Sequence, residues 1–297
     1  MNTAVDNPFW MKSAPDLESD ESLVAKAVEG QQEALEELVR RHQAWLYNLA
    51  IRMVRLPQDA EDATQEILLK AVTHLDSFRG ESKFRTWLWR IAIRHVLKMK
   101  KRTLEEPASS FDEFARRLDY CEDRPLKGTL DAGGPEVELL IEEARVSCTM
   151  AMLLCLDREQ RIIFVLGDIF SVDSRVGGEL LEITPVAFRQ RLTRARRDLY
   201  AFMQGKCGLA NRDNPCRCRN KTRAFIEKGL IDPNRLEFAK RYLRQVKDVA
   251  PQQLVTLQGL DEQYSDVYRS HPFLEPRDHV VLLRRVLKSD AAKKLLN

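Results

Sequence analysis

The side chains best placed to bind a partner lie in residues 184–203, a segment with two distinct helical faces. Its apolar residues are spaced four, three, four and three apart, as in a helix packed on a core: Phe188, Leu192, Ala195, Leu199 and Phe202. The rest of the segment carries cationic and hydrogen-bonding side chains: Arg189, Gln190, Arg191, Thr193, Arg194 and Arg197. In the major groove of DNA, Arg pairs with guanine and Gln with adenine. Thr184 and Pro185 are a typical helix start, and a helix–turn pattern begins at Asp173. The segment therefore predicts a DNA-reading helix, with a solvated surface helix as the alternative.

A second candidate binding segment, residues 78–101, mixes aromatic with cationic side chains. Four of its cations recur at helical spacing, which suits a phosphate backbone: Arg90, Arg94, Lys98 and Lys101. Its aromatic residues are suited to stacking on unpaired bases or to anchoring a core: Phe78, Phe84, Trp87 and Trp89. Because Trp87 and Trp89 are two residues apart, they point to different faces of a helix, and at most one is deeply buried. The segment predicts contact with single-stranded DNA.

A third pattern places three carboxylates along one face of a helix expected from Asp59 to Leu75. Asp59, Asp62 and Glu66 follow helical spacing, while a separate apolar stripe faces the core. The carboxylates form a stripe and not a pocket. With no His/Asp/Glu constellation, Gly-rich phosphate loop or complete metal site in the sequence, we do not expect an enzyme.

Charge is distributed in blocks along the 297 residues, although the net charge is only +3. Residues 79–102 carry nine Lys/Arg and one Glu, residues 103–143 carry twelve Asp/Glu and four Lys/Arg, and residues 184–206 carry six Lys/Arg and one Asp. Two basic blocks around an acidic connector suggest two nucleic-acid contacts, although solvated helix faces would give similar blocks. No apolar run is long enough to span a membrane and no signal peptide is recognisable, so we expect a cytoplasmic protein without membrane insertion.

Helical periodicity dominates the chain, and the expected fold class is all-α, with two small helical domains and a helical tail. We expect a flexible N-terminus over 1–19 and a first domain over 20–102. An acidic linker over 103–136 contains one short helix from Phe111 to Tyr120. A helix–turn–helix domain covers 137–204, and a Cys-containing extension, which we expect to be regulatory, covers 205–297.

The extension contains three closely spaced cysteines: Cys207, Cys216 and Cys218. Their C-x8-C-x-C spacing is not a standard zinc pattern, and a tetrahedral site needs a fourth ligand, such as His271 or His279. Six Lys/Arg from Arg212 to Lys228 would lower the pKa of these thiols and favour reactive thiolates. A zinc or other metal site, a redox sensor and a purely structural turn all stay open. No cofactor is required by anything else in the sequence.

Two stretches resemble the sigma-70 family of bacterial RNA polymerase sigma factors. Residues 59–95 (DAEDATQEILLKAVTHLDSFRGESKFRTWLWRIAIRH) are similar to region two of that family. Residues 153–170 (LLCLDREQRIIFVLGDIF) and 180–199 (LLEITPVAFRQRLTRARRDL) are similar to region four. Together the two regions cover about half the chain, and the absence of a further domain between them resembles the extracytoplasmic-function group. Some members of that group carry Cys-bearing C-terminal extensions.

The resemblance implies a non-catalytic initiation factor that binds core RNA polymerase, on its clamp helices and flap, and promoter DNA. The acidic face of Asp59, Asp62 and Glu66 would dock on the clamp helices. The following residues would capture the −10 element: Phe78, Arg79, Gly80, Glu81, Ser82, Lys83, Phe84, Trp87, Arg90 and Arg94. The face from Arg189 to Arg197 would read the −35 element, and an anti-sigma factor is a further candidate partner.

This sequence departs from the family pattern in three places. Glu182 stands where a Gly is common before the recognition helix, Gly177 and Gly178 replace Ile-Ala, and Arg94 replaces a frequent Asn. The first two leave the geometry of the turn in question, and the third leaves the −10 preference open. The alternative function is a stand-alone helix–turn–helix regulator with a sensing tail, which would leave the acidic face and the aromatic segment unused.

Overall fold

The computed structural model of the chain describes residues 18–99, 110–122, 135–238, 268, 274 and 276–287. In these residues all regular structure is helical, apart from one isolated bridge between Cys207 and Cys216, so the predicted all-α class is confirmed. The chain forms two compact units, one of residues 1–100, 175–185 and 273–297, the other of residues 101–174 and 186–272. None of the described helices is both long enough and apolar enough to cross a membrane.

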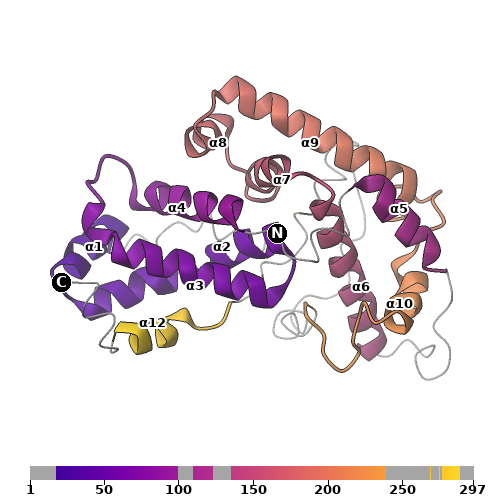
Figure 1. Cartoon of the computed structure of the whole chain (residues 1–297), viewed down its shortest axis with the longest axis horizontal. Helices are drawn as coiled ribbons and strands as arrows, with labels where there is room; N and C mark the ends of the chain where they lie inside the picture. The colour runs from indigo at the N-terminus through magenta and orange to yellow at the C-terminus, as the bar shows by residue number, and fades with distance from the viewer. Residues whose placement is uncertain are drawn as a thin grey trace, which may run out of the picture. The chain divides into compact units, whose positions relative to one another are not determined.

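The first unit contains most of the N-terminal helices, drawn from indigo to magenta in Figure 1. Its elements are α1 (Asp20–Val28), α2 (Gln32–Val54), α3 (Pro57–Thr73), the 3-10 turn η1 (Leu75–Ser77), α4 (Phe84–Lys98), α8 (Ser174–Leu181) and α12 (His279–Leu287). Ser19 caps α1 by accepting a hydrogen bond from the Ser22 N–H at 3.1 Å. Gly30, at φ +90°, separates α1 from α2, and Pro57 occupies the first turn of α3.

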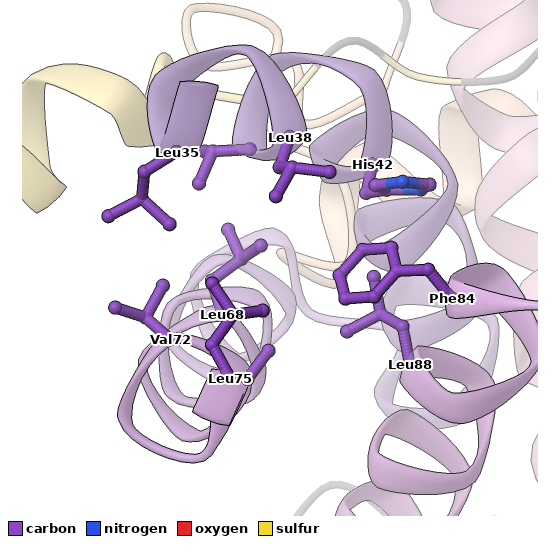
Figure 2. Close-up of a pocket in the computed structure, with 10 residues that line it drawn as sticks. Leu35, Leu38, His42, Leu68, Val72, Leu75, Phe84 and Leu88 are labelled. Atoms are coloured by element: carbon purple, nitrogen blue, oxygen red, sulfur yellow. The ribbon is translucent and has the colours of Figure 1, made fainter. Parts of the chain in front are cut away.

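The core of this unit lies between α2, α3 and α4. The indoles of Trp45 and Trp89 stack there with centroids 4.3 Å apart, and both are almost fully buried. Figure 2 shows a small cavity beside this core, between leucines of α2 and α3 and the ring of Phe84. The cavity measures about 20 Å³ and is lined almost wholly by apolar side chains, so it is a packing void and not a ligand site.

The second unit contains α5 (Phe111–Tyr120), α6 (Pro135–Leu154), α7 (Arg158–Phe164), the π-helical turn η3 (Val165–Ile169), α9 (Pro185–Lys206) and α10 (Cys218–Glu227). The short helix predicted inside the linker is confirmed as α5, which Ser110 caps through the Glu113 N–H at 3.1 Å. Asp157 and Gln160 form a capping box at the start of α7, which fixes where this helix begins.

Helices from the predicted linker and the predicted extension share one small core. Its buried residues come from α5, α6, α10 and the segment after α10: Leu118, Cys121, Leu140, Ala144, Ala224, Phe225 and Ile231. The buried ammonium of Lys221, on α10, donates to the carbonyls of Leu118, at 3.0 Å, and Cys121. Lys221 therefore satisfies carbonyl groups at the C-terminal end of α5, and part of the extension folds together with part of the linker.

Candidate nucleic-acid interface

Helix α9 has the two faces that the sequence predicts. Its core side buries Phe188, Leu192, Ala195 and Leu199, whereas Phe202 is half-buried. Its other side exposes five of the six predicted base-reading residues: Arg189, Gln190, Thr193, Arg194 and Arg197. The sixth, Arg191, is half-buried, and its guanidinium lies 3.2 Å from Glu159. The exposed set is a continuous hydrogen-bonding surface of the kind that enters a major groove.

The π-helical turn η3, which continues α7, packs closely against α9. A Cβ on Gly167 would lie 2.6 Å from Leu192 Cδ2, so a larger residue here would require the Leu192 side chain to shift. One residue on, the fully buried carboxylate of Asp168 accepts hydrogen bonds from both Nε and Nη2 of Arg196 and one from the hydroxyl of Tyr200, at 3.2 Å. Asp168 was not among the predicted site residues. It fixes the rotation of α9, and with it the direction of the exposed side chains.

The turn that precedes α9 explains two of the departures from the family pattern. Glu182 has φ +57°, a left-handed conformation that glycine adopts without strain. A Cβ on Gly178 would lie 2.8 Å from the carbonyl oxygen of Ile183, so α8 has a glycine where the turn comes closest. Gly178 therefore leaves room for the turn, while Glu182 in the turn itself keeps a strained left-handed conformation.

The aromatic residues of the second candidate segment divide into exposed and buried members. Phe78 and Trp87 are half-buried, with ring centroids 5.8 Å apart. Phe84 is only 2% exposed and packs under both rings, and Trp89 is 1% exposed. The prediction that one of Trp87 and Trp89 is deeply buried is confirmed. Phe84, predicted to contact DNA, lies in the core because its ring packs edge-on against His42. A base could therefore stack only on Phe78 or Trp87.

The loop that leads into α4 presents polar groups next to these two rings. Arg79, Gly80, Glu81 and Lys83 are exposed, and Ser82 is half-exposed. Gly80 has φ +70° in this turn, and Arg79 and Lys83, which flank the turn in sequence, are solvent-facing cations. Exposed cations close in sequence to half-exposed aromatic rings are a combination found in proteins that bind single-stranded nucleic acid.

Two cations of α4 are paired with carboxylates, one on α8 and one in the turn that follows it. Arg90 Nη2 lies 2.7 Å from Glu179, and Arg94 Nη2 lies 2.5 Å from Glu182. The side chains of the Arg94 pair are 63% and 68% exposed, so the pair adds little stability and a phosphate could replace the glutamate.

The buried end of α4 depends on residues that the sequence analysis did not identify. Glu21 accepts a hydrogen bond from the Phe84 N–H at 3.0 Å and so caps α4 from another helix. His42 Nδ1 accepts from Trp45 Nε1 at 2.9 Å, and His42 Nε2 lies 3.0 Å from Asp20. Burial lowers the pKa of His42, and the neighbouring Asp20 carboxylate offsets part of that shift. The contacts of Glu21 with Phe84 and of Asp20 with His42 link different helices, so no pattern within one helix signals them.

The predicted acidic face on α3 is smaller than its three carboxylates suggest. Asp59 is only 4% exposed and does not belong to the surface. Asp62 is half-exposed and accepts a hydrogen bond from Gln58 at 3.0 Å, and the side chain of Glu66 is 62% exposed. Asp62 and Glu66 are therefore the carboxylates available to a partner. Glu61, which the sequence analysis did not select, is 4% exposed and contacts the C-terminal segment.

In the part of the chain that the structure describes, the cysteines of the extension are not part of a metal-binding group. Cys207, Cys216 and Cys218 line one small cavity, but no three His, Cys, Asp or Glu side chains in the described residues are placed to hold an ion. Of the two suggested fourth ligands, His279 lies beside Glu61, and His271 is outside the described residues. Burial raises the pKa of Cys207, and that of Cys218 to about 12. The expected lowering of the thiol pKa is therefore wrong, because desolvation outweighs the nearby cations.

Comparison with known proteins places these surfaces in a family. Residues 38–104 match the family described as Sigma-70 region 2, which covers α4, α3 and most of α2. The chain is 35% identical over 127 residues to the RNA polymerase sigma-H factor of Pseudomonas aeruginosa, covering 42% of this chain and 64% of that protein. It is 29% identical over 178 residues to the ECF RNA polymerase sigma-E factor of Escherichia coli K12, covering 60% of this chain and 91% of that protein. Residues 38–104 therefore match sigma-70 region 2, and the chain is similar to proteins named as sigma factors, one of them of the ECF type.

The chain is also similar to a solved structure, that of CnrH in complex with the cytosolic domain of CnrY. The TM-score is 0.45 at 24% identity, covering 63% of this chain and 99% of that chain. The match with the sigma-E factor spans 178 residues of 297, so a substantial part of this chain lies outside that match.

Proposed function

We propose that this chain is a sigma factor that binds core RNA polymerase and directs it to promoters, using separate surfaces for polymerase, duplex DNA and melted DNA. The exposed face of α9 would read the −35 element through Arg189, Gln190, Thr193 and Arg194. Phe78 and Trp87, with the loop from Arg79 to Lys83, would capture the −10 element. The carboxylates of Asp62 and Glu66 would dock on the polymerase clamp helices.

The observation that carries this proposal is the pairing of two different DNA-binding surfaces in one chain. A hydrogen-bonding helix face suits intact duplex, whereas half-exposed aromatic rings beside cations suit unpaired bases. A protein that only recognises duplex has no use for the second surface. The proposed activity is binding without a chemical step, its location is the cytoplasm, where the polymerase acts, and an anti-sigma factor is a further proposed partner.

Selection of DNA from a random library, with and without core polymerase, tests the proposal. We expect the chain with polymerase to enrich DNA that carries two separated sequence elements. The Arg189→Ala, Gln190→Ala variant should lose only one of them, and Arg223→Ala, a half-exposed change on α10, should lose neither. Equal enrichment of a single element without polymerase would instead support the stand-alone regulator.

A further inference from the structure

A segment near the C-terminus lies against α2 and α3 of the same unit, where Figure 1 draws α12 in yellow. Its first contact is made by backbone. The amide of Asn48, on α2, donates to the Leu274 carbonyl at 2.8 Å and accepts from the Leu274 N–H at 2.8 Å. A side-chain amide that pairs with both polar groups of one residue recognises main chain, as a neighbouring β-strand would. Leu274 itself is only 3% exposed.

The second contact surrounds the start of α12. Glu61, on α3, accepts from the Arg277 N–H at 3.2 Å, and its carboxylate lies 3.1 Å from His279 Nε2. Gln43, on α2, accepts from the His279 N–H at 3.0 Å. Side chains of two helices thus satisfy the N–H groups that the beginning of α12 leaves unpaired. Glu61 and His279 are both almost fully buried, so the contact excludes water.

The third contact combines apolar side chains with an ion pair. Val280 and Leu283 are each 4% exposed. The guanidinium of Arg284 donates to both carboxylate oxygens of Glu36, with the Nε–Oε1 distance at 2.5 Å. This two-point geometry is specific for Arg. Its hydrogen bonds, together with that from Gln32, lower the pKa of Glu36 to about 2, so the pair stays charged at neutral pH.

We infer that the surface formed by Glu36, Gln43, Asn48 and Glu61 is a peptide-docking site, and that residues 274–284 are its built-in occupant and compete with core polymerase for α3. The competition rests on the proposed function. Glu61 holds the occupant and directly precedes Asp62, one of the two carboxylates proposed to dock on polymerase. Polymerase seated on Asp62 and the segment bound to Glu61 would therefore occupy the same stretch of α3. Release of residues 274–284 would then be the step that frees the polymerase-binding surface.

Two variants of the full chain test this inference by opening the segment in different ways. Leu283→Asp removes a buried apolar contact, and Arg284→Glu sets two carboxylates against each other. The double variant Glu36→Arg, Arg284→Glu restores an ion pair with reversed polarity. Arg223→Glu, which breaks the exposed pair with Glu227 on α10, is a charge-matched control. Hydrogen exchange at the amides of residues 274, 277 and 279 reports docking, and titration with core RNA polymerase reports affinity.

We expect both single variants to exchange faster at these amides and to bind core polymerase about tenfold more tightly than the unmodified chain. The double variant should return toward the unmodified values, and Arg223→Glu should match them. Unchanged exchange in Leu283→Asp would overturn the docking site. Faster exchange with unchanged affinity would overturn the competition while the proposed function stands. If no form binds polymerase, the proposed function itself fails, and the competition fails with it.

Discussion

Asp168 of η3 and Arg196 of α9 form a two-point ion pair, with Nη2–Oδ1 at 2.6 Å and Nε–Oδ2 at 2.9 Å. Asp168 is fully buried, whereas the Arg196 side chain is 37% exposed. Asp168→Asn keeps the shape but removes the charge, so we expect the free energy of unfolding to fall by about 1–3 kcal/mol. Urea denaturation measures this change. Glu159→Gln, at the exposed pair with Arg191, should change it by less than about 0.5 kcal/mol. Equal effects of the two substitutions would contradict the assigned role of Asp168.

At the strained turn before α9, a substitution is predicted to raise the free energy of unfolding. Glu182→Gly relieves a left-handed conformation at φ +57°, and we expect it to stabilise the fold by about 1 kcal/mol. Three residues earlier, Glu179→Gly lies inside α8 and should destabilise by about 1 kcal/mol. Thermal unfolding of both variants compares the two effects. A destabilised Glu182→Gly would mean that its contact with Arg94 outweighs the strain.

Substitution of Trp87 is predicted to impair promoter opening, whereas substitution of Phe84 is predicted to lower the free energy of unfolding. Trp87→Ala removes a half-exposed ring, and we expect a loss of promoter opening equivalent to about 1–3 kcal/mol with a smaller loss of stability. Phe84→Ala removes a buried ring and should lower the free energy of unfolding by about 3–5 kcal/mol. Permanganate reactivity of promoter thymines reports opening, and urea denaturation reports stability. If Trp87→Ala opens promoters normally, Trp87 is not the stacking surface.

The buried His42 predicts a pH dependence of stability. Burial lowers its pKa in the folded chain, so in mildly acidic solution the unfolded chain binds a proton that the folded chain does not. The free energy of unfolding should therefore fall as the pH is lowered from about 7.5 through the unfolded pKa of about 6.5. The part of the slope due to His42 is at most about 1.4 kcal/mol per pH unit and ends once the folded pKa is passed. His42→Gln should flatten this part of the profile, and His74→Gln, at an exposed site, should not. An unchanged profile in His42→Gln would contradict the prediction.

Local pattern was sufficient to predict much of this fold. The spacing of apolar residues predicted the helices and the buried stripe of α9, and composition predicted the helix from Phe111 to Tyr120. The exposed face from Arg189 to Arg197 followed from the same periodicity. These features depend on neighbours within one helix, so the sequence contains the information that determines them.

Features that depend on distant contacts were missed or misplaced. Asp59 and Phe84 fit helical faces in the sequence, yet tertiary packing buries both. Cys218 lies among cations, but desolvation decides its pKa. The contact between Asn48 and Leu274 joins residues 226 positions apart, and nothing in either local segment indicates it. A buried polar residue such as Asn48 in an otherwise apolar helix face is the one signal that could have pointed to a partner.

The exposed acidic face of α3, which consists of Asp62 and Glu66, predicts which substitutions affect polymerase binding. Asp62→Lys with Glu66→Lys reverses the two exposed carboxylates, and we expect the affinity for core polymerase to fall about tenfold or more. Glu29→Lys, an exposed charge reversal after α1, is the control and should leave the affinity unchanged. Circular dichroism checks that the helices are retained. Equal affinity of all three proteins would remove Asp62 and Glu66 from the proposed surface.

Transcription in vitro from a promoter library tests the central claim most directly, with purified core RNA polymerase supplied alone or with the full chain. We predict that the chain causes specific transcript starts whose upstream DNA shares two elements, and that core polymerase alone produces none of them. To allow for occupancy of the polymerase-binding surface by residues 274–284, the Leu283→Asp variant is assayed in parallel. No specific starts with either protein would contradict the proposal that this chain directs polymerase to promoters.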